Sequence, residues 1–306
     1  IFIAIKGKRY DGHQFVNEAI NKGAILIIID NKKPIKILIK KKINFIFCKN
    51  SRILLSKISS NFFPKQPDFI SAVTGTNGKT SVSHITKEIW KNCNVSSATI
   101  GTIGLITDKY EKKLPLTTID SIQLHRILTS LYKKKINHLC IEASSHGLEQ
   151  NRIDNIKINT AAFTNFSHDH LDYHKNLSHY ISSKLDLFKL HVQKNGKSLI
   201  NSDTDHFKKI KESLNRNRVN YEILSKRSKR YGIKSVNIRG NLTSAKIFIN
   251  SKLYQFNFSW INPCWSASEN RQPILLNRHS RRMDYCPKNE RVSNSFDKHP
   301  CLMGRQ

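Results

Sequence analysis

Short apolar runs separated by polar turns organise the first 65 residues. The runs alternate with segments of helical spacing, and Gly23 ends the first of those segments. The pattern predicts three strands and two helices, at Ile1–Ile5, Ala24–Ile29 and Phe45–Cys48 and at His13–Lys22 and Ser51–Phe63. We predict a partial small α/β domain at 1–65. It opens as if inside a strand, so we expect a segment before Ile1 to be missing.

From residue 66 onward, apolar runs of strand length alternate with longer helical patterns. The predicted strands are Phe69–Val73, Ser97–Ile100, His138–Ala143, Ile158–Thr164 and Ser198–Ile200, and the predicted helices are Thr80–Trp90, Ser121–Lys133 and His179–Leu190. This alternation predicts an α/β fold with a central, mostly parallel sheet of the P-loop type, covered by helices. Ligands bind such sheets beyond the carboxyl ends of the strands, so we expect site residues in the loops that follow them.

The end of this region, residues 219–258, has a different pattern. Alternating apolar residues at Val236–Ile238, Ala245–Ile249 and Leu253–Phe258, with turns at Gly240–Asn241 and Asn250–Ser251, predict a small antiparallel appendage. We assign residues 66–258 to one domain. Hydrophobic periodicity is lost afterwards, so 259–306 is expected to be an irregular tail and not a native domain.

Charge and composition narrow the classes of partner. Lys and Arg outnumber Asp and Glu by 52 to 22, a formal charge of +30. Such an excess is typical of nucleic-acid binders, but it is spread along the whole chain without a nucleic-acid-binding motif. We favour a compositional bias and predict no nucleic-acid partner. No apolar run approaches the ~20 residues of a membrane span, so we expect no membrane partner.

The six cysteines form no C-x-x-C pair, which is typical of a reduced, cytoplasmic chain. We expect a cytoplasmic monomer.

The sequence TGTNGKTS follows the predicted strand that ends at Val73 and precedes a helix. This placement directs backbone N–H groups at a phosphate, with Lys79 as a cation for it and the Thr80 hydroxyl as a ligand for Mg²⁺. Val73 stands where the general P-loop has its first glycine. The alternative to a phosphate-binding loop is an ordinary turn between a strand and a helix. The predicted nucleotide-binding residues are Gly75, Thr76, Asn77, Gly78, Lys79, Thr80 and Ser81.

Two further polar stretches follow predicted strands. In EASSHGLEQNR, Glu142 is a carboxylate where a cation on phosphate oxygens would lie, and Ser144, Gln150 and Arg152 suit an anionic or sugar-like ligand. The alternative is a solvated polar loop.

The second of these stretches is TNFSHDHLDYH, whose three histidines, His168, His170 and His174, raise a zinc hypothesis. Their spacing matches no common zinc pattern, and one histidine on a nucleotide-bound Mg²⁺ is the alternative.

Four motifs in order, TGTNGKTS, TTIDS at Thr117–Ser121, EASSHGLEQNR and TNFSHDHLDYH, resemble the Mur ligases of peptidoglycan synthesis. The resemblance covers residues 1–258. It is strongest to the family member that adds the third amino acid to the peptidoglycan precursor. It implies an enzyme, an ATP-dependent amide ligase with Mg²⁺. Its substrates would be UDP-MurNAc-L-Ala-D-Glu and an amino acid, diaminopimelate, joined through an acyl phosphate.

The resemblance also implies roles for individual residues. The substrate-binding residues would be Thr117, Thr118, Ser144, Gln150 and Arg152. The metal site would comprise Thr80, Glu142, His170 and Lys184. Lys184 matches the lysine that the family carbamylates, although on its own residue pattern it is a solvated helix lysine. Lys79, Lys184 and His170 would be catalytic.

The sequence also departs from the family. Leu116 and Lys8–Tyr10 replace residues that commonly contact the substrate. The Asp-Asn-Pro-Arg motif does not occur in these 306 residues, so we expect the third domain to be missing. The hypothesis is therefore a truncated ligase. The alternatives are an inactive remnant that binds nucleotide without turnover, folylpolyglutamate synthetase, which shares the ATP loop, and a basic nucleic-acid binder.

Overall fold

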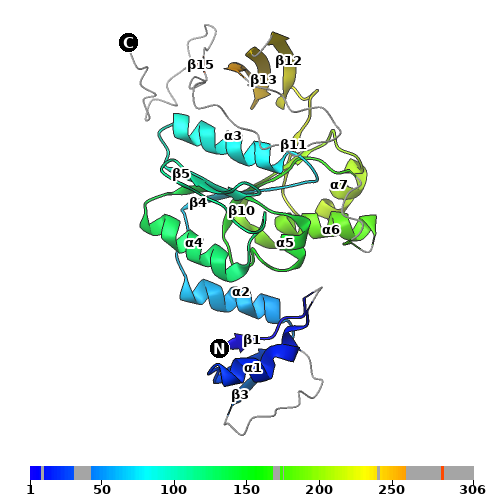
Figure 1. Cartoon of the computed structure of the whole chain (residues 1–306). Coiled ribbons are helices and arrows are strands. Elements are labelled where there is room, and N and C mark those ends of the chain that lie inside the picture. The colour runs from blue at the N-terminus through cyan, green and yellow to red at the C-terminus, as the bar shows by residue number, and fades with distance from the viewer. Residues whose placement is uncertain are drawn as a thin grey trace. The chain divides into compact units, whose positions relative to one another are not determined.

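A computed structural model describes residues 1–7, 10–30, 43–167, 173–174, 176–239, 242–259 and 284–285. The chain divides into two compact units, residues 1–198 with 208–220, and residues 199–207 with 221–306. We describe each unit by itself (Figure 1). Within the described residues no helix has both the length and the apolar character needed to cross a bilayer.

The first unit begins with a small parallel sheet in the order β1-β2-β3. Its strands are β1 (Phe2–Ile3), β2 (Leu26–Ile29) and β3 (Asn44–Phe47), and its helical segments are η1 (Gly12–Phe15), α1 (Val16–Asn21) and α2 (Ser51–Phe62). Val16 and Ile20 of α1 bury against Ala4, Ile27 and Ile29, so the helix covers one face of the sheet. The Asn50 side chain accepts hydrogen bonds from two backbone N–H groups and caps α2.

The larger sheet of this unit has the strand order β10-β9-β4-β8-β5-β6-β7. Its strands are β4 (Phe69–Thr74), β5 (Ser97–Gly101), β6 (Gly104–Thr107), β7 (Glu111–Lys112), β8 (His138–Glu142), β9 (Ile158–Phe163) and β10 (Val192–Asn201). The helices are α3 (Lys79–Asn92), α4 (Ser121–Lys133), α5 (Ser145–Glu149), α6 (Leu177–Asp186) with the π-helical turn η2 (Leu187–His191), and α7 (Phe207–Arg216).

Strand β4 lies between β8 and β9 and is parallel to both, and β5 is parallel to β8. Helix α3 lies on one face of the sheet, and α4 and α5 lie on the other (Figure 1). Apolar residues of neighbouring strands are fully buried, such as Ile70 of β4 and Leu139 of β8. The parallel strands therefore bring the ends of β4, β5, β8 and β9 to one edge, as the alternating pattern predicted.

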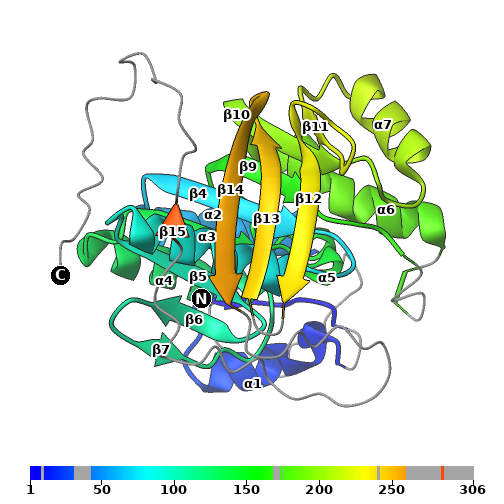
Figure 2. The same ribbon diagram turned by 90° about the horizontal axis from the view of Figure 1, so that it is seen from above.

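The second unit contains an antiparallel sheet in the order β12-β13-β14-β15. Its strands are β12 (Tyr231–Arg239), β13 (Leu242–Ile249), β14 (Lys252–Ser259) and β15 (Asp284–Tyr285), and β11 (Glu222–Leu224) pairs with Leu199–Asn201 at the end of β10. The three long strands run in alternating directions (Figure 2). Asn250 and Ser251 both have positive φ, +54° and +68°, as a two-residue hairpin turn requires.

The predicted fold class is confirmed: a mostly parallel sheet with helices, a small α/β unit before it and an antiparallel appendage. The structure adds β6, β7, β11, α5 and α7, which the apolar pattern did not indicate. Helix α7 is an example, because only Ile210 and Leu214 bury within its highly basic sequence. The predicted domain boundaries stay predictions, and the Gly240–Asn241 turn lies outside the described residues.

Candidate active site

The TGTNGKTS loop joins β4 to α3 and is held by the segment after β9. The Thr76 N–H donates to the Asn165 carbonyl oxygen at 2.9 Å, and the Asn77 N–H donates to Asn165 Oδ1 at 2.9 Å. The Thr164 hydroxyl donates to the Asn77 carbonyl oxygen at 2.7 Å. Gly75 has φ +142°, and a Cβ there would collide with the Thr164 side chain and the Asn165 backbone. Only glycine therefore fits at this point of the loop.

Two lysine ammonium groups meet at the loop. Lys79 Nζ donates to the carbonyl oxygens of Gly75 and Thr76 at 3.1 and 2.8 Å. Lys184 Nζ from α6 donates to the same Gly75 oxygen at 2.7 Å. Lys184 is 1% exposed, and its Nζ lies 4.4 Å from the centre of the Tyr180 ring. The interpretation of Lys184 as a solvated helix lysine is therefore wrong.

Glu142 ends β8 and is 2% exposed. One carboxylate oxygen accepts from the Thr80 hydroxyl at 2.9 Å and from the Thr102 hydroxyl at 3.1 Å, and the other accepts from the Thr102 N–H at 2.9 Å. Thr80 begins α3, and Thr102 follows β5. Three elements thus place hydroxyl and carboxylate oxygens together beside the loop, and such oxygens are the ligands that Mg²⁺ prefers.

Thr118 links Glu142, at the end of β8, to Ser144, at the start of α5. Its hydroxyl donates to the Glu142 carbonyl oxygen at 2.8 Å and lies 3.0 Å from Ser144 Oγ, and it accepts from the Ser144 N–H at 3.0 Å. Ser144 Oγ in turn accepts from the Gly147 N–H at 3.1 Å and caps α5. The Thr117 hydroxyl lies 3.1 Å from the Thr102 hydroxyl, which links this group to Glu142.

Two guanidinium groups converge on Gln150. Its Oε1 accepts from Arg152 at 2.7 Å and from Arg52 of α2 at 3.4 Å, and its Nε2 donates to the Tyr173 hydroxyl at 3.0 Å. Arg152 also donates to the Thr118 carbonyl oxygen at 2.6 Å. Burial lowers the pKa of Arg152, and the Arg52 charge lowers it further. Two like charges side by side are suited to a carboxylate or phosphate ligand.

The structure brings most of the predicted site residues into these groups. Lys79 and Lys184 both donate to the Gly75 carbonyl oxygen of the loop, and Thr80 donates to Glu142. The sheet edge also carries the predicted substrate-binding residues, Thr117, Thr118, Ser144, Gln150 and Arg152. Ser81 lies exposed on the first turn of α3. His170 lies outside the described residues, as does His168 of the zinc hypothesis. His174 is described, and it lies beside Glu149 and His179.

Sequence reasoning missed several residues that shape these groups. Thr102 could have been found, because it lies two residues after a predicted strand in a sheet whose ligands bind at strand ends. Asn165 could have been found in the same way. Arg52 gives no such signal, because it lies in a basic chain 98 residues from Gln150.

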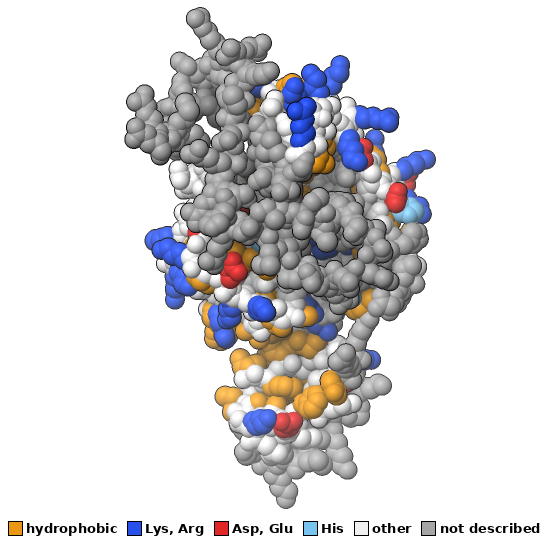
Figure 3. Space-filling view, turned by 45° about the horizontal axis from the view of Figure 1, so that its top comes forward, with side chains coloured by type: hydrophobic (Ala, Val, Ile, Leu, Met, Phe, Trp, Pro, Cys, Tyr) orange, Lys and Arg blue, Asp and Glu red, His pale blue; other side chains and the backbone are white. Residues whose placement is uncertain are grey.

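Basic side chains visible on the described surface stand at many separate places in Figure 3 and form no single continuous field there. The local Arg52–Arg152 pair is therefore a more specific feature than the net charge of the chain.

The sequence and fold of the chain match known families and proteins. Residues 1–71 match the Mur ligase family, catalytic domain, and residues 73–262 match the Mur ligase middle domain. One relative is the UDP-N-acetylmuramoyl-L-alanyl-D-glutamate--2,6-diaminopimelate ligase of Bradyrhizobium diazoefficiens. It is 42% identical over 67% of this chain and 41% of its own length. The protein of that name from Rickettsia conorii is 38% identical over 84% of this chain and 53% of its own length.

Among solved structures, one of a UDP-N-acetylmuramoyl-L-alanyl-D-glutamate--2,6-diaminopimelate ligase has a TM-score of 0.69 and 26% identity, over 83% of this chain and 52% of the other. The chain thus spans about half the length of the relatives it matches. The matches extend from residue 1 to residue 262 and contain all four motifs. The chain belongs to the Mur ligase family.

Proposed function

We propose that this chain is an ATP-dependent amide ligase of peptidoglycan precursor synthesis. It would join meso-diaminopimelate to UDP-MurNAc-L-Ala-D-Glu and release ADP and phosphate. The names of the relatives support the substrates. The observation that carries the proposal is the meeting of two lysines at the Gly75 carbonyl beside the Thr80–Glu142 pair. Because the chain spans about half the length of those relatives, the whole reaction stays a proposal.

ATP would bind at the TGTNGKTS loop. Backbone N–H groups at the start of α3 point toward a phosphate there, and the Lys79 ammonium would turn from the loop carbonyls to the γ-phosphate. Asn165 holds the loop through the Thr76 and Asn77 N–H groups, so its shape is set before the nucleotide arrives.

Mg²⁺ would be held by Thr80 and Glu142, with His170 as a further ligand from the sequence resemblance. Their hydroxyl and carboxylate oxygens lie 2.9 Å apart, which fits a hard cation. When bound, Mg²⁺ offsets the negative charge of the phosphates during transfer. Lys184 would be carbamylated. Carbamylation replaces the buried ammonium with an anion, which the bound Mg²⁺ would offset, and the burial of Lys184 would keep that anion beside the loop.

The muramoyl dipeptide would lie along Thr117, Thr118 and Ser144, with an anionic group on Arg152 and Gln150. A D-Glu carboxylate oxygen attacks the γ-phosphorus of ATP. The bond from that phosphorus to the bridging oxygen breaks, and ADP leaves. The amine of diaminopimelate then attacks the acyl carbon, the amide bond forms, and phosphate departs as the amine loses a proton. The Lys79 cation and the loop N–H groups stabilise the transferring phosphoryl group.

The test is ADP release by the chain with ATP, Mg²⁺, the UDP-linked dipeptide and diaminopimelate. We expect release to require both acceptor substrates, and Lys79→Ala to lower it by at least about 100-fold. Lys91→Ala removes an exposed lysine from the same helix and should leave it unchanged. ADP release without the dipeptide would contradict the ligase. Nucleotide binding without any ADP release would instead support the binding remnant.

The same proposal places the chain in the cytoplasm and in cell wall biogenesis, where it would affect cell shape and division. ATP and UDP-linked precursors are the substrates that this location would supply.

A further inference from the structure

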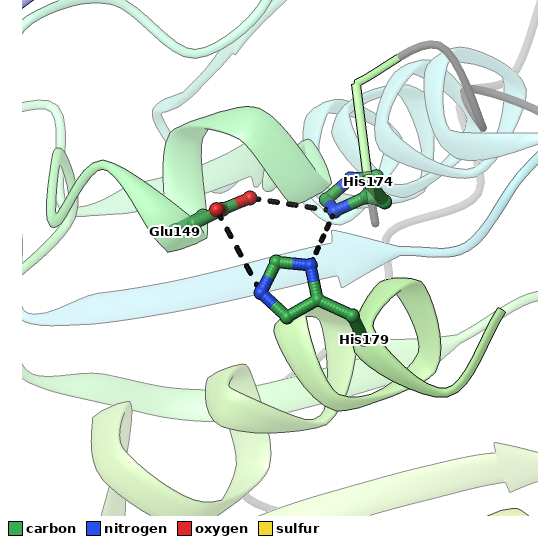
Figure 4. Close-up of side chains that lie close together, drawn as sticks. All are labelled: Glu149, His174 and His179. Atoms are coloured by element: carbon green, nitrogen blue, oxygen red, sulfur yellow. Dashed lines mark hydrogen bonds and ion pairs between the residues drawn. The ribbon is translucent and has the colours of Figure 1, made fainter. Parts of the chain in front are cut away.

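Three side chains that carry metal-binding atoms meet away from the Thr80–Glu142 pair, and Figure 4 shows them facing one another. Glu149 ends α5, His179 lies in the first turn of α6, and His174 precedes that helix. His174 Nδ1 lies 3.3 Å from Glu149 Oε2 and 3.4 Å from His179 Nδ1. His179 Nε2 lies 3.8 Å from Glu149 Oε1. One atom from each residue can be chosen so that all three lie within 4.8 Å of one another.

His174 is held in one orientation. Its side chain is fully buried, and its Nε2 lies 3.0 Å from the hydroxyl of Ser145, which is itself 2% exposed. With the proton on Nε2, the ring donates to Ser145 and directs the Nδ1 lone pair toward Glu149 and His179. Metal-bound histidines are fixed in the same way, by a hydrogen bond from the ring nitrogen that does not touch the metal.

The donor set and its spacing suit a transition metal. Two imidazoles and one glutamate are the protein ligands of open zinc sites, which keep a fourth position for water. Tetrahedral bonds of about 2.0–2.1 Å separate neighbouring ligand atoms by about 3.3 Å. His174 Nδ1 lies at about that distance from Glu149 Oε2, at 3.3 Å, and from His179 Nδ1, at 3.4 Å. A set with one atom from each residue lies within 4.8 Å, so a small movement of the side chains would bring all three ligand atoms onto one ion. The His179 side chain is 37% exposed, so this ligand of the site reaches solvent.

The same three residues can also pair without a metal. With the proton on Nδ1, His174 would donate to Glu149, and the Ser145 hydroxyl would donate to Nε2. That arrangement explains the contact with Glu149. In that arrangement His179 Nδ1 faces the protonated Nδ1 of His174 and can only accept a hydrogen bond from it. The distance of 3.4 Å between the two nitrogens allows this. The two arrangements differ in one measurable property, the affinity for a transition metal.

We propose that Glu149, His174 and His179 form a binding site for a borderline divalent metal, with Zn²⁺ as the occupant. Imidazole nitrogens favour Zn²⁺ over Mg²⁺, which prefers oxygen atoms alone, so this site differs in chemistry from the Thr80–Glu142 pair. The bound ion joins the end of α5 to the start of α6. Gln150 directly follows Glu149, and Lys184 lies further along α6, so the ion stiffens the connection between the segments that carry these two residues.

The experiment uses the full chain, freed of metal with a chelator and titrated with Zn²⁺ by calorimetry and with Co²⁺ by visible absorption. We expect the wild type to bind one more equivalent of Zn²⁺ than His179→Ala and to show the absorption of tetrahedral Co²⁺. Other cysteines and histidines contribute equally to both proteins, so the difference isolates this site. Glu149→Gln keeps the shape of the side chain and should weaken Zn²⁺ binding at least about tenfold.

His206→Asn is the matched control. His206 lies in the other unit, and Asn accepts its positive φ of +59°. This variant should bind as much Zn²⁺ as the wild type. Thermal unfolding in chelator checks that all variants fold, and Zn²⁺ should raise the melting temperature of the wild type more than that of His179→Ala. Equal stoichiometry and equal melting shifts for those two proteins would overturn the proposal in favour of the metal-free pairing.

Discussion

The Lys184 ammonium lies 2.7 Å from the Gly75 carbonyl oxygen, although 109 residues separate them in the chain. Lys79 donates to the same oxygen from the first turn of α3. A single backbone carbonyl of the loop therefore binds one lysine from each of two helices. Because Lys184 is buried within α6, this contact fixes the position of the loop relative to that helix.

The proposed carbamylation of Lys184 can be tested directly. Exposing the chain to ¹³C-labelled bicarbonate should give a carbamate signal in the carbon NMR spectrum. The carbamate is an anion, and a metal ion bound beside it would stabilise its negative charge. Lys184→Met should remove the signal, and Lys91→Met, at an exposed lysine, should keep it. A spectrum without the carbamate in wild-type chain saturated with Mg²⁺ and ATP would contradict the assignment.

Gly75→Ala should destabilise the chain more than Gly78→Ala. Both glycines have positive φ, +142° and +81°. Gly78 lies in the left-handed region, which an alanine adopts at a cost of about 1–2 kcal/mol, whereas the φ of Gly75 lies beyond that region. A Cβ at Gly78 meets nothing within 4 Å, whereas one at Gly75 meets Thr164 and the Asn165 backbone. We expect a loss of about 3 kcal/mol or more for Gly75→Ala in urea unfolding. Equal losses would show that the loop moves aside.

The sequence predicted the sheet because buried parallel strands are nearly continuous apolar runs, as at Phe69–Val73 and His138–Ala143. Glu142 and Thr80 could be predicted because parallel strands end at the same edge. The burial of Lys184 could not be predicted from residue pattern, because lysines are abundant and helix position alone does not set exposure. The resemblance to a family supplied a role for Lys184, as a carbamylated lysine, but not its burial.

Pairings between distant segments were also beyond the sequence. Arg52 reaches Gln150 only because α2 packs near the end of α5, and no local pattern reports that contact. Likewise, His179 meets His174 and Glu149 through the geometry of α5 and α6, and the zinc hypothesis named only neighbours in sequence. Short elements such as β7 were missed because two residues carry no periodicity.

Thr118→Val should destabilise the first unit without changing side-chain volume. Thr118 is 4% exposed, and its hydroxyl bonds to the Glu142 carbonyl, the Ser144 N–H and Ser144 Oγ. Removing it leaves buried backbone groups without this partner, at a cost of about 1–3 kcal/mol in denaturant unfolding. Thr129→Val is the control, because its bond to the Lys65 carbonyl lies at an exposed position where water can replace it. A smaller loss for Thr118→Val than for the control would contradict the tie between β8 and α5.

The stability of the chain should fall in mild acid because of His191. Burial lowers the pKa of His191 to about 4, from a model-peptide value near 6.5. Below pH 6.5 the unfolded chain binds a proton that the native chain does not, so stability is lost as pH falls from 6.5 toward 4. The loss from this residue is about 3 kcal/mol by pH 4. Burial raises the pKa of Asp154, whose Oδ1 lies 3.6 Å from His191, so the native chain binds a proton there before the unfolded chain does. Asp154 therefore acts in the opposite direction as pH falls toward 3.8. Comparing unfolding free energies of wild type and His191→Gln at pH 7.5 and pH 4 isolates His191. We expect the variant to lose less stability between these two values, and an equal loss would show that His191 is protonated in the native chain.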